Sequence, residues 1–152
     1  RESYNGQKFS HASAIRRCLD YKNVSIISFG IRNISKNEIP FLKKNSSRIN
    51  IFWAKDKSKW NLNKFKKLIK NKTVYLTFDV DGLDSSIMPA TGTPEPGGLL
   101  WDETLNIIRI AAKNSKIVGA DINELSPIKG FNSYNFLVAK LAYKILSYKF
   151  LY

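Results

Sequence analysis

Cysteine and histidine are almost absent from the sequence, which contains one of each among 152 residues. A single cysteine, Cys18, excludes an internal disulfide framework and fits a reducing cytoplasm, where we expect the protein to be found. Long apolar runs are absent as well: none approaches the length of a membrane span, and no signal-peptide pattern is visible. The sequence therefore predicts a cytoplasmic protein without a membrane partner.

Acidic residues are few, because 12 Asp and Glu face 25 Lys and Arg, which gives a net charge of +13. Such an excess is compatible with a nucleic-acid or membrane partner. The lysines are nevertheless scattered over expected helix faces and loops, without the clustering and aromatic interleaving of a nucleic-acid surface. Asn, Ile and Tyr, which share A- and T-rich codons with Lys, are also abundant. We therefore expect a solvated basic surface and no nucleic-acid partner.

What the chain does contain is the composition of a globular protein, with 43% apolar and 24% charged residues. Its length is sufficient for one domain, or part of one, with a sizeable core. The first residue is Arg1 and not Met. We therefore expect that the chain was cut from a longer protein or lacks its first part.

Apolar strand patterns alternate with amphipathic helix patterns along the chain. Helices are expected over residues 10–20, 36–45, 63–70, 101–114 and 134–150, and strands over residues 24–31, 49–53, 73–78 and 117–122. Strict alternation of this kind predicts an α/β fold in which a parallel sheet is covered by helices on both faces. No linker or internal repeat interrupts it.

The expected strand 73–78 runs directly into three carboxylates, Asp79, Asp81 and Asp84, and then into a loop rich in proline and glycine. Ligands of open α/β folds bind at the carboxyl ends of the strands. Asp79 and Asp81 share one side of the strand, because side chains alternate with a period of two, and paired oxygen ligands suit a divalent metal. The alternative is that they cap the next helix or bind loop amides, and for Asp84 this bracing role is favoured.

Two further residues are candidates for chemistry. Glu124 follows the expected strand 117–122, so it is expected at the same sheet edge as Asp79 and Asp81, where three acids repel one another unless a metal or a cationic substrate neutralises them. The alternative for Glu124 is an ion pair with a surface lysine. His11, the single histidine, has the one side chain suited to proton transfer near neutral pH, although a structural role is the more common one for a lone histidine.

Three segments in the correct order resemble the ureohydrolase family of arginases and agmatinases. They are TFDVDGLDSSIMPATGTPEPGGL at residues 77–99, GADINELSP at residues 119–127 and KFSHASAIRRC at residues 8–18. The helix pattern FLVAKLAYKIL near the end of the chain also fits, and the segment around His11 is most similar to agmatinases. The resemblance covers nearly the whole chain, and its Asp-rich segment is highly specific.

The resemblance implies a three-layer α/β/α fold, of which this chain is about the C-terminal half, and two Mn²⁺ ions per active site. It implies that Asp79 bridges the ions, that Asp81 binds one of them, and that Glu124 pairs with the guanidinium group of the substrate. His11 matches the family's proton shuttle, and Thr93 is expected to hold the Glu124 carboxylate. The implied reaction is hydrolysis of agmatine to putrescine and urea by a metal-bridging hydroxide, a step of polyamine biosynthesis. The family also forms trimers or hexamers.

The chain departs from the family in its metal ligands. Two further ligand motifs are expected before Arg1, and the two carboxylates present are too few for tight manganese binding. We therefore expect residues 1–152, read as a single partial domain, to be inactive alone. Ser85 and Asn123 also stand where the family commonly has proline and an apolar residue. The alternatives are a different guanidino substrate, as in arginase or guanidinobutyrase, and a non-catalytic fragment.

Overall fold

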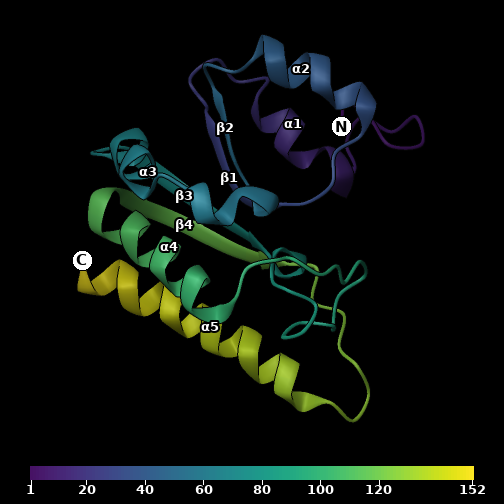
Figure 1. The fold of residues 1–152 in the computed structure, drawn as a ribbon, viewed down its shortest axis with the longest axis vertical. Helices are drawn as coiled ribbons and strands as arrows, with labels where there is room; N and C mark the ends of the chain where they lie inside the picture. The colour runs from purple at the N-terminus through teal and green to yellow at the C-terminus, as the bar shows by residue number, and fades with distance from the viewer. The chain divides into compact units, whose positions relative to one another are not determined.

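The computed structural model describes residues 1–152, which form two compact units, Arg1–Lys55 and Asp56–Tyr152. Each unit contains one pair of parallel strands, as Figure 1 shows, so the predicted alternation of strands and helices is confirmed. None of the helices is long and apolar enough to span a bilayer. That residues 1–152 make a single partial domain stays a prediction.

The first unit is built around the strands β1 (Ile26–Ile31) and β2 (Ile49–Trp53). The rings of Phe29 and Phe52, which are paired in register, stack with their centres 4.3 Å apart. The Arg48 guanidinium donates hydrogen bonds to the carbonyls of Leu19, Tyr21 and Val24, which fixes the segment that enters β1.

Helices of the first unit are shorter than the sequence patterns predict. The expected helix 10–20 is a 3₁₀ turn, His11–Ser13, followed by α1 (Ala14–Cys18). The expected helix 36–45 begins as a 3₁₀ turn, Lys36–Glu38, and continues as α2 (Ile39–Lys44). Pro40 lies in the first turn of α2, where the missing amide hydrogen has no helical acceptor to lose.

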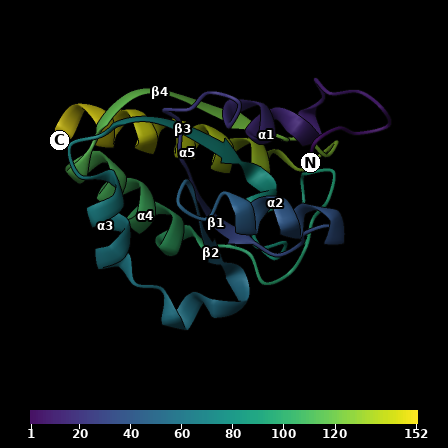
Figure 2. The same cartoon turned by 90° about the horizontal axis from the view of Figure 1, so that it is seen from above.

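The second unit follows the order α3 (Leu62–Ile69), β3 (Thr73–Asp79), α4 (Trp101–Asn114), β4 (Lys116–Asn123) and α5 (Asn132–Leu151). The parallel pair β3 and β4 runs from Thr73 opposite Lys116 to Asp79 opposite Asn123. Figures 1 and 2 show α4 and α5 side by side along this pair. The core between them contains Ile108, Ile117, Leu141 and Ile145, all less than 9% exposed.

This arrangement brings the ends of β3 and β4 to one edge of the unit. Because the strands are parallel and in register, the residues that follow them leave the sheet next to each other. The long segment between β3 and α4 therefore starts beside the turn that follows β4. The candidate residues of the second unit lie at the last position of β3 or in these segments.

Candidate functional site

Two carboxylates occupy the end of β3. Asp79 is the last residue of the strand, and its Oδ1 accepts a hydrogen bond of 3.1 Å from the backbone amide of Asp81. Asp81 lies in the 3₁₀ turn Val80–Gly82, and its Oδ2 accepts a hydrogen bond of 2.9 Å from Thr93 Oγ1. The strand thus delivers Asp79, and the turn and Thr93 orient Asp81.

The electrostatics of this strand end are unfavourable for Asp79. Burial, together with the neighbouring charges of Asp81 and Glu124, raises the pKa of Asp79 to about 6, although the amide of Asp81 opposes the shift. Neither Asp79 nor Glu124 forms an ion pair with a lysine or arginine of this unit. The sequence therefore correctly predicted that acids gather at this edge, and the alternative of a Glu124–lysine pair is not what the structure shows.

Glu124 adopts a backbone conformation that non-glycine residues rarely take. It follows β4 directly with φ of 65°, in the left-handed region. The next residues hold it there: Leu125 forms an antiparallel bridge with Thr91, and the amide of Ser126 donates a 2.9 Å hydrogen bond to the Ala90 carbonyl. Strained residues that their surroundings fix in this way are concentrated at functional sites.

The loop that carries Thr91 and Thr93 is closed at its neck by Asp84. The Asp84 carboxylate accepts hydrogen bonds from the amide and hydroxyl of Ser86 and from the amides of Gly97 (2.6 Å) and Gly98 (3.1 Å). Chief among these, the Ser86 bonds lower the pKa of Asp84 to about 2. The predicted role of Asp84 as a loop brace is therefore confirmed.

Close backbone packing completes the neck. Leu83 bridges Leu99, and a Cβ added to Gly98 would lie 2.5 Å from the Leu83 carbonyl carbon. Glycine is consequently required at position 98, since neither backbone can move away. This closed loop reaches both sides of the site, because it binds Asp81 through Thr93 and the Glu124 turn through Thr91.

Thr93 and His11 differ in how the structure bears on their predicted roles. The hydrogen bond that the structure shows for Thr93 is to Asp81 and not to Glu124, so a role in holding Glu124 stays a prediction. His11 belongs to the first unit, where it begins a 3₁₀ turn and its ring meets Tyr4 edge-on, with centres 5.8 Å apart. Its role in proton transfer also stays a prediction.

A cluster on the uncovered face of the β3–β4 pair was missed by sequence reasoning. Asp121 Oδ1 accepts hydrogen bonds from Thr77 Oγ1 (2.7 Å) and from the Asn123 amide group. A hydrogen bond to Asp121 also raises the pKa of Tyr75. The signal was present, because these positions alternate along their strands and Asn123 lies in register with Asp79.

The ligand atoms of the site are of the type that manganese prefers, but they are few. Asp79 and Asp81 offer the hard oxygens that Mn²⁺ accepts. The structure contains no group of three or more His, Cys, Asp or Glu side chains placed to hold a metal ion. The two carboxylates thus fit part of a coordination shell, and the chain does not complete one.

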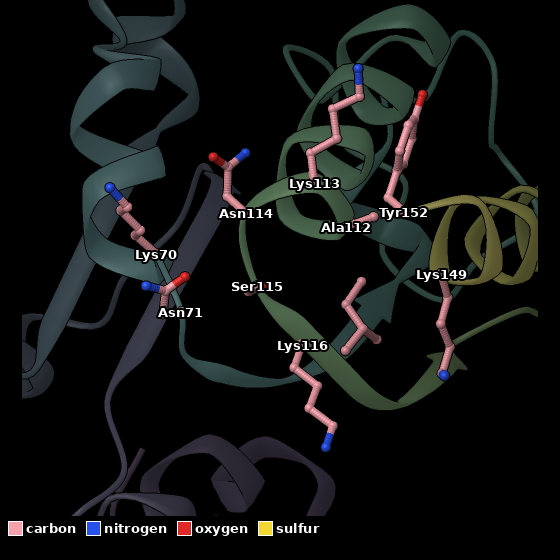
Figure 3. Close-up of a pocket in the computed structure, with 10 residues that line it drawn as sticks. Lys70, Asn71, Ala112, Lys113, Asn114, Ser115, Lys116, Lys149 and Tyr152 are labelled. Atoms are coloured by element: carbon pink, nitrogen blue, oxygen red, sulfur yellow. The ribbon is translucent and has the colours of Figure 1, made fainter.

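A hollow of about 540 Å³ lies at the other edge of the β3–β4 pair, where the strands begin. Figure 3 shows that its lysine side chains point outward in different directions; they are Lys70, Lys113, Lys116 and Lys149. Three of them lie in the last turn or at the C-terminal cap of α3, α4 and α5. Positive charge is favourable there because helix C-termini carry partial negative charge. This placement explains the lysines without a ligand.

Comparison with known proteins gives one consistent result. A family model described as the arginase family matches residues 1–147. The chain is 36% identical over 151 residues to "N(1)-aminopropylagmatine ureohydrolase" of Synechocystis sp.. The aligned residues cover 97% of this chain and 48% of that protein. It is 34% identical over 148 residues to "Agmatinase" of Pyrococcus horikoshii, covering 96% of this chain and 50% of that protein.

The solved structures agree. The structure of agmatine ureohydrolase of Thermoplasma volcanium matches with a TM-score of 0.82 at 33% identity, over 98% of this chain and 50% of that one. An arginase from Medicago truncatula matches with a TM-score of 0.78 at 27% identity, over 98% of this chain and 48% of that one. The chain spans about half the length of the curated relatives it matches.

Proposed function

The chain belongs to the arginase family, and on that basis we propose that it carries part of the active site of a ureohydrolase that cleaves the guanidinium group of agmatine. Relatives at 34% and 36% identity are named for agmatine or its N(1)-aminopropyl derivative, which supports a linear guanidino substrate. The observation that carries the proposal is the acidic edge formed by Asp79, Asp81 and Glu124. The raised pKa of Asp79 shows that negative charge is unfavourable at this edge, so a bound cation would stabilise it.

The proposed reaction assigns one task to each residue. Glu124 binds the guanidinium cation of the substrate. Water adds to the guanidinium carbon, the bond from that carbon to the alkyl-substituted nitrogen breaks, and urea and a primary amine leave. His11 donates the proton that the departing amine requires.

Manganese is part of the proposal. Asp79 and Asp81 would supply two of its oxygen ligands, and the metal when bound lowers the pKa of water so that it attacks at neutral pH. The product from agmatine is putrescine, which places the reaction in polyamine biosynthesis. We also propose a cytoplasmic location and assembly into a homo-oligomer.

The test is urea release, measured on the protein in the length that its natural host produces. We expect urea from agmatine when Mn²⁺ is added, and little from arginine or guanidinobutyrate. Preference for arginine or guanidinobutyrate would reassign the substrate within the family. No urea from any of these compounds, with manganese present, would refute the enzymatic proposal.

Replacing Glu124 separates substrate binding from metal binding. Glu124→Gln removes the charge that pairs with the guanidinium, so the KM for agmatine should rise and kcat should fall, while manganese content stays unchanged. Asp102→Asn is the matched control, because Asp102 is exposed in the first turn of α4 and is not among the groups that shift the pKa of Asp79. Loss of manganese in the Glu124 variant would show that Glu124 is a ligand instead.

Substitutions of Asp79 and His11 separate the loss of metal binding from the loss of proton transfer. Asp79→Ala should lose both bound manganese and turnover, as measured by elemental analysis and urea release. His11→Ala should keep its manganese and slow turnover by about two to four orders of magnitude, the usual contribution of general acid–base catalysis. A near-normal rate for His11→Ala would contradict the shuttle role.

A non-catalytic role is the second candidate, and the incomplete donor set favours it. It predicts that the protein binds no manganese in equilibrium dialysis and releases no urea. The ureohydrolase proposal predicts the opposite on both counts. The two assays together therefore distinguish the candidates.

A further inference from the structure

Lys57 connects the neck of the loop to the start of α4. It lies in the 3₁₀ segment Ala54–Lys59, and its ammonium group donates hydrogen bonds to the Gly98 carbonyl (2.8 Å) and to Glu103 Oε2 (3.0 Å). These partners lie 41 and 46 residues further along the chain. The side chains of Lys57 and Glu103 are 28% and 37% exposed, so the contact is partly buried. The neck is therefore held from a segment that precedes both β3 and α4.

Gly98 is held through both of its backbone polar groups. Its amide donates a hydrogen bond of 3.1 Å to Asp84 Oδ2, and its carbonyl accepts the one from Lys57. Asp84 and Lys57 thus fix the backbone on both sides of the Gly98 Cα, at the point where the loop ends.

Glu103 links the same lysine to the helix. Its Oε2 accepts hydrogen bonds from the Lys57 ammonium and from the amide of Leu100 (2.8 Å), the N-cap residue of α4. Helix α4 is itself anchored in the core of the unit by buried side chains, among them Leu105 and Ile108. Lys57 consequently ties the end of the loop to a firmly packed helix.

The far part of the loop touches the acidic edge at two places. The Thr93 hydroxyl donates a hydrogen bond of 2.9 Å to Asp81, and the Ala90 carbonyl accepts one of 2.9 Å from the Ser126 amide, two residues after Glu124. A rotation of the loop about its neck displaces both contacts together, because one closed loop carries them. Misplacement of reacting groups by about 1 Å lowers rates by up to about 100-fold.

Stability alone is a weak explanation for the contacts of Lys57. A partly exposed ion pair contributes little to the free energy of unfolding. The neck is already closed by the hydrogen bonds of Asp84 and by the bridge between Leu83 and Leu99. What Lys57 adds is a connection between the neck and α4, which the bonds of Asp84 do not provide.

We propose that Lys57 is a positioning residue of the acidic edge. Through Gly98 and Glu103 it sets the placement of the loop, and through the loop it sets the orientation of Asp81 and of the turn at Glu124. The catalytic consequence rests on the proposed function, whereas the placement of the loop rests on the contacts described above. The two are therefore tested separately.

Hydrogen exchange followed by mass spectrometry tests the placement, on the protein in the length that its natural host produces. Lys57→Met removes the ammonium group and keeps an unbranched side chain. We expect the peptide around Ser126 to exchange about tenfold faster in this variant, and peptides of α5 to be unchanged. Lys57→Arg should restore the protection, because a guanidinium can donate to a carbonyl and a carboxylate together. Lys59→Met is the matched control, since Lys59 is exposed in the same 3₁₀ segment.

Urea release tests the catalytic consequence. Lys57→Met should lower kcat/KM for agmatine by about tenfold, because the orientation of Asp81 and Glu124 is disturbed. Lys57→Arg should recover most of the loss, and Lys59→Met should not change kcat/KM.

Unchanged exchange around Ser126 in Lys57→Met would overturn the proposal. Equal acceleration throughout α5 would also overturn it, because Lys57 would then stabilise the whole unit and not the loop. Faster exchange around Ser126 with an unchanged kcat/KM would overturn the catalytic consequence. A parent protein that releases no urea would refute the proposed function, and the exchange measurement alone would then decide whether Lys57 positions the loop.

Discussion

Replacing the central carboxylate of the acidic edge should make the protein more stable. In Asp79→Asn the amide oxygen can still accept the hydrogen bond from the Asp81 amide, so the local geometry is preserved. The substitution removes the carboxylate charge of Asp79. Burial and the neighbouring Asp81 and Glu124 raise the pKa of that carboxyl group to about 6. The substitution therefore isolates the electrostatic cost of assembling the site.

The sign and size of the effect follow from the two pKa values. Because the pKa of Asp79 is raised in the folded state, its contribution to stability is complete below the unfolded value near 3.8 and is lost as the pH rises through about 6. A shift of that size corresponds to about 3 kcal/mol at most. Asp79 is partly exposed to water, and screening reduces the expected gain of Asp79→Asn to about 1 kcal/mol at neutral pH.

The assay is urea unfolding of the 152-residue chain at several pH values without divalent metal. The variant should be more stable than the parent above about pH 6 and equal to it below about pH 4. Removing any acid from a chain of net charge +13 raises its positive charge, which by itself should lower stability. Asp102→Asn measures this general effect, so that it can be separated from the effect of Asp79→Asn. A variant that is less stable at neutral pH, or a difference that does not depend on pH, would refute the electrostatic reasoning.

Two further substitutions test the neck of the loop. Gly98→Ala should destabilise the chain by about 2 kcal/mol or more in urea unfolding, because the new Cβ meets the Leu83 backbone; Gly92→Ala, which has open space around it, should change little. Asp84→Asn should cost about 1 kcal/mol near neutral pH. The pKa of Asp84 is lowered to about 2 in the folded chain. The parent should therefore be more stable than Asp84→Asn by the full amount above the usual pKa of 3.8, and this difference in stability should vanish as the pH falls through about 2. A difference in stability between the parent and Asp84→Asn that does not change with pH would refute the idea that the Asp84 carboxylate stabilises the loop through its charge.

The order of elements was accessible from the sequence because burial leaves a periodic trace. The strand ending at Asp79 was recognised by its alternating apolar residues, and the helix 101–114 agrees with α4 at both ends. Short elements were less well predicted: the expected helix 10–20 contains only Ala14–Cys18 as α-helix. Five residues form too little of a helix for local propensity to decide, so contacts elsewhere in the unit set its limits.

The site was predictable where it depends on strands and not where it depends on loops. Asp79 and Glu124 were placed together by the rule that parallel strands end at one edge. The left-handed conformation of Glu124 and the bridge from Leu125 to Thr91 leave no periodic pattern, because they pair irregular segments far apart in the sequence. The same reason hid the bond from Thr93 to Asp81.

The acidic edge is most informative when it is set against the charge of the whole chain. A protein with 25 lysines and arginines has ample means to neutralise a cluster of carboxylates, and it pairs Glu2, Asp20 and Glu103 in this way. Asp79 and Glu124 have no such partner within their unit, and Glu124 is held there in a strained conformation. Both features cost stability as long as no cation is bound. An arrangement that is unfavourable when empty becomes favourable when a cation enters it, so the stability gained by Asp79→Asn measures the electrostatic repulsion that such a cation would relieve.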